Sequence, residues 1–203
     1  MDTIQSMHNI LRVESEAIAA IPITKSYEEA IDIIVEHVHR RGGKLVTSGM
    51  GKAGQIAVNI ATTFASTGTP AVSIHPCDAQ HGDLGVLQPN DVLLLISNSG
   101  RTSEIIQLMD YARHLYPQIP VIAIVGEPES ELARKADISL ITAPAPEVGP
   151  HGLTPTTSIT MMTVIGHLLV VAIMNITGFT REQYAMRHQG GNLGDKLRNS
   201  LPK

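Results

Sequence analysis

The sequence predicts an α/β protein, built as a three-layer αβα sandwich around a five-stranded parallel sheet. The first observation is a series of short apolar or β-branched runs bounded by Gly, Pro or polar turns, which is typical of buried strands. These runs are residues 44–48, 71–75, 92–97, 121–126 and 138–142. The second observation is that helical stretches lie between the runs, as expected of crossovers between parallel strands. They cover about residues 52–67, 103–115 and 129–136.

Further helices flank this alternating core. Two helices precede the first strand, and Ser26 with Glu29 predicts a capping box at the start of the second one. A long apolar helix near residues 157–177 follows the last strand, and Thr180 to Gln183 offers another helix start. The proline-rich segment 143–155 is predicted to be a long loop, and loops of that length are usually functional.

The composition limits the classes of function. At 203 residues the chain is predicted to form one domain, residues 1–203, large enough to bury a core without disulfides. The formal net charge is −4, with no Trp and only two Phe, which argues against nucleic-acid binding. Cys77 is the only cysteine, and the sequence does not open with a basic and apolar leader. We therefore expect a cytoplasmic protein.

The apolar segment from Ile159 to Ile176 is long enough to resemble a membrane span. It contains several polar side chains, including His167 and Asn175, and a helix that is apolar on all sides is normally buried. We predict that one face packs on the sheet and the other on a second subunit, with His167 as a hydrogen-bonded core residue. The sequence therefore predicts a homo-oligomer that has no membrane span.

The run from Val92 to Ile96 leads into a Ser-rich turn, which predicts a buried strand followed at once by the N-terminus of a helix. The N–H groups of a helix's first turn have no internal partner and lie at the positive end of its dipole, so they bind phosphate well. Ser97, Ser99 and Thr102 add hydroxyl groups at the same point. Because a helix cap needs only one hydroxyl, this cluster favours an anion site over a simple cap.

A glycine-rich turn, Ser48 to Gly54, follows the first predicted strand, and open parallel sheets bind ligands at the ends of their strands. Its glycines have the spacing of a dinucleotide-binding fingerprint, but His75 stands where an acidic partner for the ribose is expected. Lys52 inside the turn is better suited to reach a phosphate or a substrate hydroxyl; the alternative is a solvated lysine at a helix start.

Four further side chains are candidates for acid–base chemistry. His81 and His188 lie in glycine-rich loops, where a histidine is more often functional than on a helix face. Glu104, in the first turn after the Ser-rich turn, and Glu147, in the long loop, are candidate bases. The alternatives are a carboxylate that complements a helix dipole and a solvated loop acid. No histidine spacing matches a familiar metal site, so we expect neither a metal nor a cofactor.

Together these motifs resemble the sugar isomerase (SIS) domain family, and within it the arabinose 5-phosphate isomerases, from about residue 5 to the C-terminus. The Ser-Asn-Ser-Gly turn is shared across SIS proteins, whereas the His-Gly-Asp-Leu-Gly turn and the terminal His-x-Gly-Gly point to these isomerases. The matching motifs, in order, are Ser48 to Gly54, Thr63 to Pro70, His81 to Gly85, Ser97 to Gly100, Gly152 to Ser158, and His188 with Gly190 and Gly191.

The resemblance implies a flavodoxin-like or Rossmann-like SIS fold and an aldose–ketose isomerase of D-ribulose 5-phosphate and D-arabinose 5-phosphate. The reaction passes through an enediol and feeds Kdo synthesis for lipopolysaccharide or capsule. The catalytic residues implied are Lys52, His81, Glu104, Glu147 and His188, with His188 shared between the subunits of a homotetramer. The predicted phosphate-binding residues, from the turns after the first and third strands, are Ser48, Gly51, Ser97, Asn98, Ser99 and Thr102.

The chain departs from the family pattern in two respects that bear on its ligands. Arg101 stands where an acidic residue is frequent, and its guanidinium beside the phosphate turn is a candidate anion contact. Longer relatives continue into a pair of CBS regulatory domains that has no counterpart here. We therefore expect feedback to act at the phosphosugar pocket, with CMP-Kdo as the candidate ligand, because its carboxylate and phosphodiester are suited to the same contacts.

Three other functions stay open at this point. Another SIS isomerase, acting on a hexulose 6-phosphate or sedoheptulose 7-phosphate, would share the fold. A non-catalytic phosphosugar-binding regulator would keep Ser97 and Ser99 but has no need for Lys52, Glu104 and His188 together. A nucleotide-binding oxidoreductase would explain only the glycine spacing.

Overall fold

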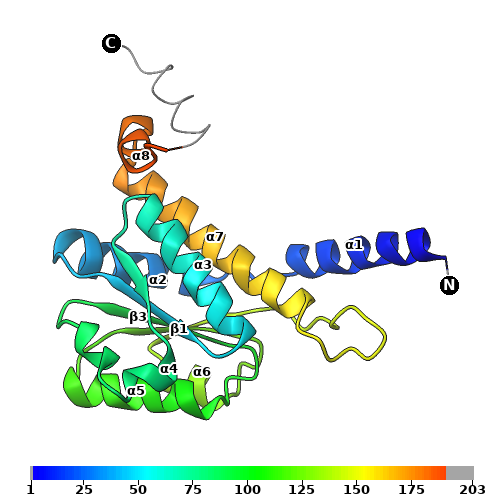
Figure 1. Ribbon diagram of the computed structural model, residues 1–203, viewed down its shortest axis with the longest axis horizontal. Coiled ribbons are helices and arrows are strands. Elements are labelled where there is room, and N and C mark those ends of the chain that lie inside the picture. Colours follow the sequence, from blue (N-terminus) through cyan, green and yellow to red (C-terminus); the bar gives the residue numbers. More distant parts are fainter. Residues whose placement is uncertain (1, 191–203) are drawn as a thin grey trace.

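A computed structural model describes residues 2–190 and contains the predicted parallel sheet (Figure 1). Its strands are β1 (Leu45–Gly49), β2 (Ala71–Ser73), β3 (Val92–Ser97), β4 (Val121–Val125) and β5 (Ile138–Ile141). They are hydrogen-bonded in the order β2-β1-β3-β4-β5, so the direction in which the chain winds reverses between β1 and β3. Open α/β sheets bind ligands at the carboxyl ends of the strands on either side of such a reversal.

Helices cover both faces of the sheet, which confirms the predicted three-layer sandwich (Figure 1). One face packs against α2 (Lys25–Ile34), α3 (Lys52–Ser66) and α7 (Thr157–Thr177). The other face carries α4 (Pro76–Ala79), α5 (Ser103–Leu115) and α6 (Glu131–Lys135). A central strand sends alternate side chains into these two layers, and all six residues of β3 are therefore buried.

The strand ends differ from the prediction by one or two residues, most clearly at β2. This strand ends at Ser73 because His75 serves as the N-cap of α4, where its Nδ1 accepts a hydrogen bond from the N–H of Cys77 at 3.3 Å. Pro76 occupies the first helical position, where a missing N–H costs nothing. The short helix α4 and the 3₁₀ turn η2 (Asp83–Val86) thus replace a predicted irregular turn.

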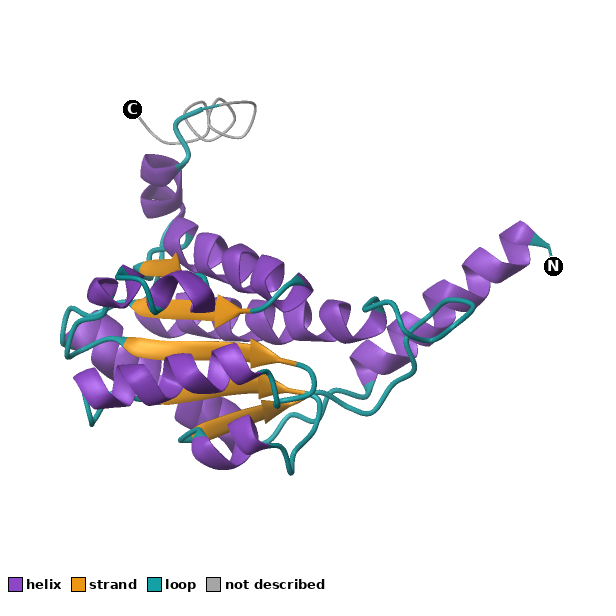
Figure 2. Ribbon diagram, turned by 60° about the horizontal axis from the view of Figure 1, so that its bottom comes forward, coloured by secondary structure: helices purple, strands orange, loops and turns teal. Residues whose placement is uncertain are grey.

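The two helices before β1 are present, but the capping box predicted for the second is wrong. Helix α2 begins at Lys25, so Ser26 lies inside its first turn, and Thr24 at the N-cap makes no side-chain capping bond. The helix continues as a π-helical segment, η1 (Val35–Arg40), that leads into β1. Helix α1 (Thr3–Ala19) projects away from the sandwich (Figure 2).

Helix α7 confirms the predicted long apolar helix. Within residues 2–190 it is the one helix long and apolar enough to cross a membrane by length and composition. Met162 and Leu169 are buried on its inner face, and it packs along the sheet beside α3, as a core helix does. Its outer face is open: Val171 is 54% exposed and Ile176 is 59% exposed. His167 also lies on this exposed face, so the prediction of a core histidine is wrong.

Helix α8 (Arg181–Arg187) begins where the sequence predicts it. The Oγ1 of Thr180 accepts a hydrogen bond from the N–H of Gln183 at 3.2 Å, and the Oε1 of Gln183 accepts one from the N–H of Thr180 at 3.0 Å. This reciprocal pair is a capping box. Figure 1 shows α8 at the end of α7 that lies away from the long loop between β5 and α7.

Candidate functional site

A cavity of about 300 Å³, which we call the anion cavity, lies at the carboxyl ends of β1 and β3. Its lining residues come from the end of β3, from the turns that precede α3, α5 and α7, and from the first turn of α3 and the first two turns of α7. They are Met50, Lys52, Ala53, Ile96, Ser97, Asn98, Ser99, Thr102, Pro155, Ser158, Ile159 and Met162. The starts of α3 and α5 carry N–H groups without an internal partner and a partial positive charge, and together they favour an anionic ligand.

The Ser-rich turn after β3 forms one wall of the anion cavity. The Oγ of Ser97 lies 2.9 Å from the Oγ1 of Thr102 and accepts a hydrogen bond from the N–H of Gly100 at 3.1 Å. Gly100 has a φ of +58°, and a Cβ there would collide with the side chain of Ser130. Thr102 is the N-cap of α5 but makes no capping bond. The side chain of Thr102 therefore takes none of the N–H groups in the first turn of α5.

The turn after β1 places a lysine at the same cavity. Gly51 is the N-cap of α3 with a φ of +60°, and Lys52 is the first residue of the helix. Gly49 and Gly54 lie so close that a Cβ on Gly54 would come within 2.7 Å of the carbonyl oxygen of Gly49. The glycine spacing is thus explained by close packing of helix on strand. No second purpose, such as dinucleotide binding, is needed to account for it.

Glu147 caps the start of α7, the third helix that borders the cavity. Its carboxylate accepts hydrogen bonds from the N–H of Thr156 at 2.7 Å, the N–H of Ser158 at 3.2 Å, and the hydroxyls of both residues. Burial alone would raise the pKa of Glu147, but these four bonds outweigh it and hold the pKa below its ordinary value. The predicted loop acid is therefore an ionised cap of α7, and it shapes the cavity through Ser158.

We predict that Glu147→Ala lowers the free energy of unfolding by about 2 kcal/mol at pH 7, because N–H groups at the start of α7 lose a charged acceptor. Since the pKa of Glu147 is lowered in the folded state, its stabilisation is complete above the unfolded pKa of about 4.3. It is lost as the pH falls through the folded pKa. Urea unfolding of wild type and variant across this pH range measures the difference.

Glu129→Ala is the matched control, because this exposed glutamate belongs to the loop after β4 and caps no helix. It should leave the free energy of unfolding within about 0.5 kcal/mol of wild type. A loss in Glu147→Ala that is the same at every pH, or no loss at all, would contradict the capping role.

Glu104 lies in the first turn of α5, one helical position after Ser103. Hydrogen bonds from its own backbone N–H and from the Ser103 hydroxyl, the latter at 2.9 Å, hold the pKa of Glu104 below its ordinary value. It is not among the residues that line the anion cavity, whose wall on this side ends at Thr102. The structure thus places an ionised carboxylate beside the cavity and open to solvent.

His81 lies outside the anion cavity. It is exposed and borders a separate cavity of about 380 Å³ together with Tyr111 and His114, between the α4 segment and α5. His188 is further away, beyond α8, where its ring stacks on Tyr184 with centroids 3.8 Å apart and its Nδ1 lies 2.9 Å from the Tyr184 carbonyl oxygen. Met162 is the last residue of α7 that lines the cavity, and the 15 residues of α7 that follow it, 163–177, separate the cavity from α8 by about 22 Å.

The structure does not bring Ser48 to the cavity. Its hydroxyl is fully buried and donates a hydrogen bond to the carbonyl oxygen of Ile74 at 2.8 Å, so it has no proton left for a ligand. Sequence reasoning missed Ser158, although a hydroxyl in the first turn of the long helix was a usable signal. It also missed the apolar part of the wall, formed by Met50, Ile96, Pro155, Ile159 and Met162.

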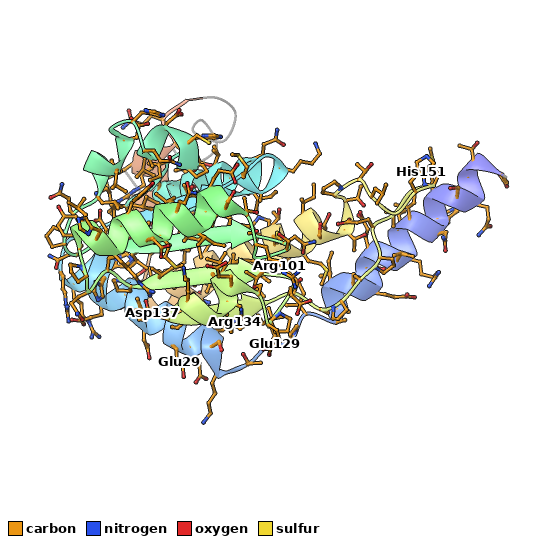
Figure 3. The ribbon with its side chains drawn as sticks, turned by 90° about the horizontal axis from the view of Figure 1, so that it is seen from below. Glu29, Arg101, Glu129, Arg134, Asp137 and His151 are labelled. Atoms are coloured by element: carbon orange, nitrogen blue, oxygen red, sulfur yellow. The ribbon has the colours of Figure 1, made fainter. Side chains whose placement is uncertain are left out.

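Arg101 is exposed, and it follows directly on the turn that lines the cavity (Figure 3). Figure 3 also shows His151 out on the long loop, away from the sheet. Over residues 2–190, no three His, Cys, Asp or Glu side chains are grouped so that they would hold a metal ion. The arrangement is therefore that of an anion site with one lysine, several hydroxyls and a neighbouring carboxylate.

Comparison with known proteins identifies the family and the same fold. The sequence pattern of the SIS domain matches residues 39–172. A structure from Bacteroides fragilis NCTC 9343, of a protein proposed to be a phosphosugar isomerase involved in capsule formation, is 57% identical. It superposes with a TM-score of 0.91 and covers 93% of this chain and 98% of that one.

Two further relatives bear on the ligand. Arabinose 5-phosphate isomerase KdsD of Escherichia coli (strain K12) is 43% identical over 193 residues, which are 95% of this chain and 58% of that protein. The chain thus spans little more than half the length of this curated relative. The c3406 protein of E. coli CFT073, solved in complex with arabinose 5-phosphate, is 33% identical with a TM-score of 0.82, over 93% of this chain and 100% of that one.

Proposed function

This chain belongs to the SIS domain family, and from that premise we propose that it interconverts D-ribulose 5-phosphate and D-arabinose 5-phosphate. The observation that carries the proposal is the anion cavity, in which the starts of α3 and α5 and the side chain of Lys52 converge on a space of about 300 Å³. A phosphate monoester is the anion that such a site suits best. The names of the relatives and the complex with arabinose 5-phosphate supply the pentose.

The reaction needs a base, an acid and a fixed substrate. In the aldose-to-ketose direction the base removes the proton from C2, the C1 carbonyl oxygen gains a proton, and an enediol forms. Loss of the proton from the C2 hydroxyl and return of one proton to C1 then give the ketose. No atom enters or leaves, so the isomerisation needs no redox partner.

We assign the parts of this reaction to residues at the cavity. The turn from Ser97 to Thr102 holds the phosphate, and the binding energy of this remote group keeps the reacting carbons in place. Glu104 serves as the base, and Lys52, the ionisable side chain among the lining residues, strengthens the attraction for the phosphate. Glu147 acts by positioning the start of α7.

His81 and His188 are assigned to sites completed by a second copy of the chain. Neither reaches the anion cavity within one copy, and the open outer face of α7 supplies an apolar surface for subunit contact. We propose a homotetramer in the cytoplasm in which His188 of one subunit completes the site of another.

A coupled assay with ribulose 5-phosphate tests the proposed function. Formation of arabinose 5-phosphate is expected, and no comparable turnover of a hexulose 6-phosphate or of sedoheptulose 7-phosphate. Turnover of one of these larger sugars instead would identify a different SIS isomerase. Tight phosphosugar binding without any turnover would identify a regulator, and binding of a nicotinamide dinucleotide in preference to phosphosugars would identify an oxidoreductase.

We further predict that CMP-Kdo inhibits competitively at the anion cavity, because its carboxylate and phosphodiester suit the Ser97 to Thr102 turn, Lys52 and Arg101. Arg101→Ala should weaken this inhibition about tenfold, since a charge-assisted contact is lost. Inhibition kinetics with ribulose 5-phosphate as the varied substrate measure both effects. Calorimetry that finds no binding at millimolar CMP-Kdo, or binding that saturating arabinose 5-phosphate leaves unchanged, would exclude this ligand.

A further inference from the structure

A second cavity, of about 340 Å³, adjoins the anion cavity and shares Asn98, Ser99 and Ser158 with it. The two spaces are therefore lobes of one depression that follows the carboxyl ends of β1, β3, β4 and β5. Gly126 and Glu127, after β4, and Thr142, after β5, belong to the second lobe alone. A phosphosugar bound in one lobe has room to extend into the other.

The charges of the two lobes differ in sign. Among the residues that line them, Lys52 is the ionisable side chain of the anion cavity and Glu127 is that of the second lobe. The remaining polar groups of the second lobe are uncharged amide and hydroxyl groups, including those of Asn98 and Thr142. A phosphate is thus attracted to the first lobe and repelled from the second, where sugar hydroxyls find acceptors.

The position of Glu127 is fixed relative to the phosphate turn. The N–H of Gly126 donates to the carbonyl oxygen of Asn98 at 2.9 Å, and the N–H of Leu132 donates to that of Gly100 at 3.0 Å. One carboxylate oxygen of Glu127 accepts the N–H of Glu129 at 3.3 Å. These bonds join the loops after β3 and β4 and leave the other carboxylate oxygen of Glu127 available to a ligand.

We propose that Glu127 determines substrate specificity by contacting the end of the substrate that lies away from the phosphate. It accepts hydrogen bonds from the hydroxyls of a neutral sugar and excludes, by like-charge repulsion, phosphosugars that end in a carboxylate. The inference rests on the proposed phosphosugar function and adds to it the orientation of the substrate and the class of molecule that is rejected.

The test compares two unreactive analogues that differ at this end alone. D-arabinitol 5-phosphate carries a hydroxyl at C1, and D-arabinonate 5-phosphate carries a carboxylate there. Calorimetry gives the ratio of their dissociation constants for wild type, Glu127→Gln and the control Glu129→Gln, which removes a charge two residues away that lines neither lobe. We expect Glu127→Gln to shift the ratio about tenfold in favour of the aldonate, and Glu129→Gln to leave it unchanged.

The outcomes separate this inference from the function on which it rests. If the wild type isomerises ribulose 5-phosphate and the ratio is the same in Glu127→Gln, the assignment of Glu127 is wrong and the function stands. An equal shift in Glu129→Gln would show a general effect of charge and would equally overturn the assignment. If the wild type neither isomerises the sugar nor binds either analogue, the proposed function fails as well.

Discussion

The Glu104→Gln variant is expected to lose about 100-fold or more in turnover while it binds the phosphosugar nearly as tightly as wild type. The amide keeps the shape of the side chain but cannot accept a proton from carbon. Because its backbone N–H and the Ser103 hydroxyl hold the pKa of Glu104 below its ordinary value, wild-type Glu104 is an ionised base at neutral pH. Steady-state kinetics with ribulose 5-phosphate, together with calorimetry, separate the two effects.

Asp110→Asn is the matched control, because Asp110 is an exposed carboxylate on the same helix and pairs with Lys135 on the surface. Its turnover should stay near the wild-type value. Near-normal turnover in Glu104→Gln would remove Glu104 from the role of base, and an equal loss in both variants would indicate damage to α5. The lowered pKa also predicts that the acid limb assigned to Glu104 lies below the ordinary pKa of a glutamate in wild type.

The three central strands, β1, β3 and β4, were predictable because they are buried on both faces and consist largely of apolar residues. β3, with six buried residues, is the clearest case. The ends of the elements were less predictable, because they depend on single hydrogen bonds. His75 ends β2 by capping α4, and Thr24 rather than Ser26 precedes α2. The π-helical segment Val35–Arg40 has no signal in its residue types that distinguishes it from an ordinary last turn.

The phosphate turn was predictable because its chemistry is local. A left-handed glycine, hydroxyls and a helix start follow one another in sequence, so Ser97 to Thr102 needed no tertiary information. The direction of a side chain at a strand end does depend on tertiary structure. Ser48 shows this, because its hydroxyl donates to the carbonyl oxygen of Ile74 rather than pointing into the cavity. The partners of Glu147 were equally hidden, because they lie nine and eleven residues further along the chain.

The place of Glu127 in the second lobe was equally hard to predict from the sequence. Glu127 lies in an ordinary acidic turn of the sequence, and the pairing of β4 with β3 and the hydrogen bond between Gly126 and Asn98 bring it beside the phosphate turn. The family resemblance implies that His188 is shared between subunits, and this stays a prediction. The structure separates it from the cavity of its own chain by the part of α7 beyond Met162, about 22 Å for 15 residues.

That separation makes a prediction about mixed oligomers. The His188→Ala and Glu104→Gln variants should each be nearly inactive alone, yet regain activity when they are denatured, mixed in equal amounts and refolded together. A shared site takes Glu104 from one copy and His188 from another. It is intact when the copy that supplies Glu104 carries His188→Ala and the copy that supplies His188 carries Glu104→Gln. With random mixing, about a quarter of the sites meet this condition, so about a quarter of wild-type activity is expected.

A mixture of Lys52→Ala with Glu104→Gln is the control that makes the result specific. Lys52 and Glu104 stand at the starts of α3 and α5 beside the same cavity of one chain, so each copy in this mixture carries a defective site and no activity should return. If the first mixture, re-formed into mixed oligomers, recovers no activity, His188 does not act between subunits. Recovery in the second mixture would mean instead that Glu104 serves the neighbouring copy's cavity, since only then would pairing two defective chains restore one complete site.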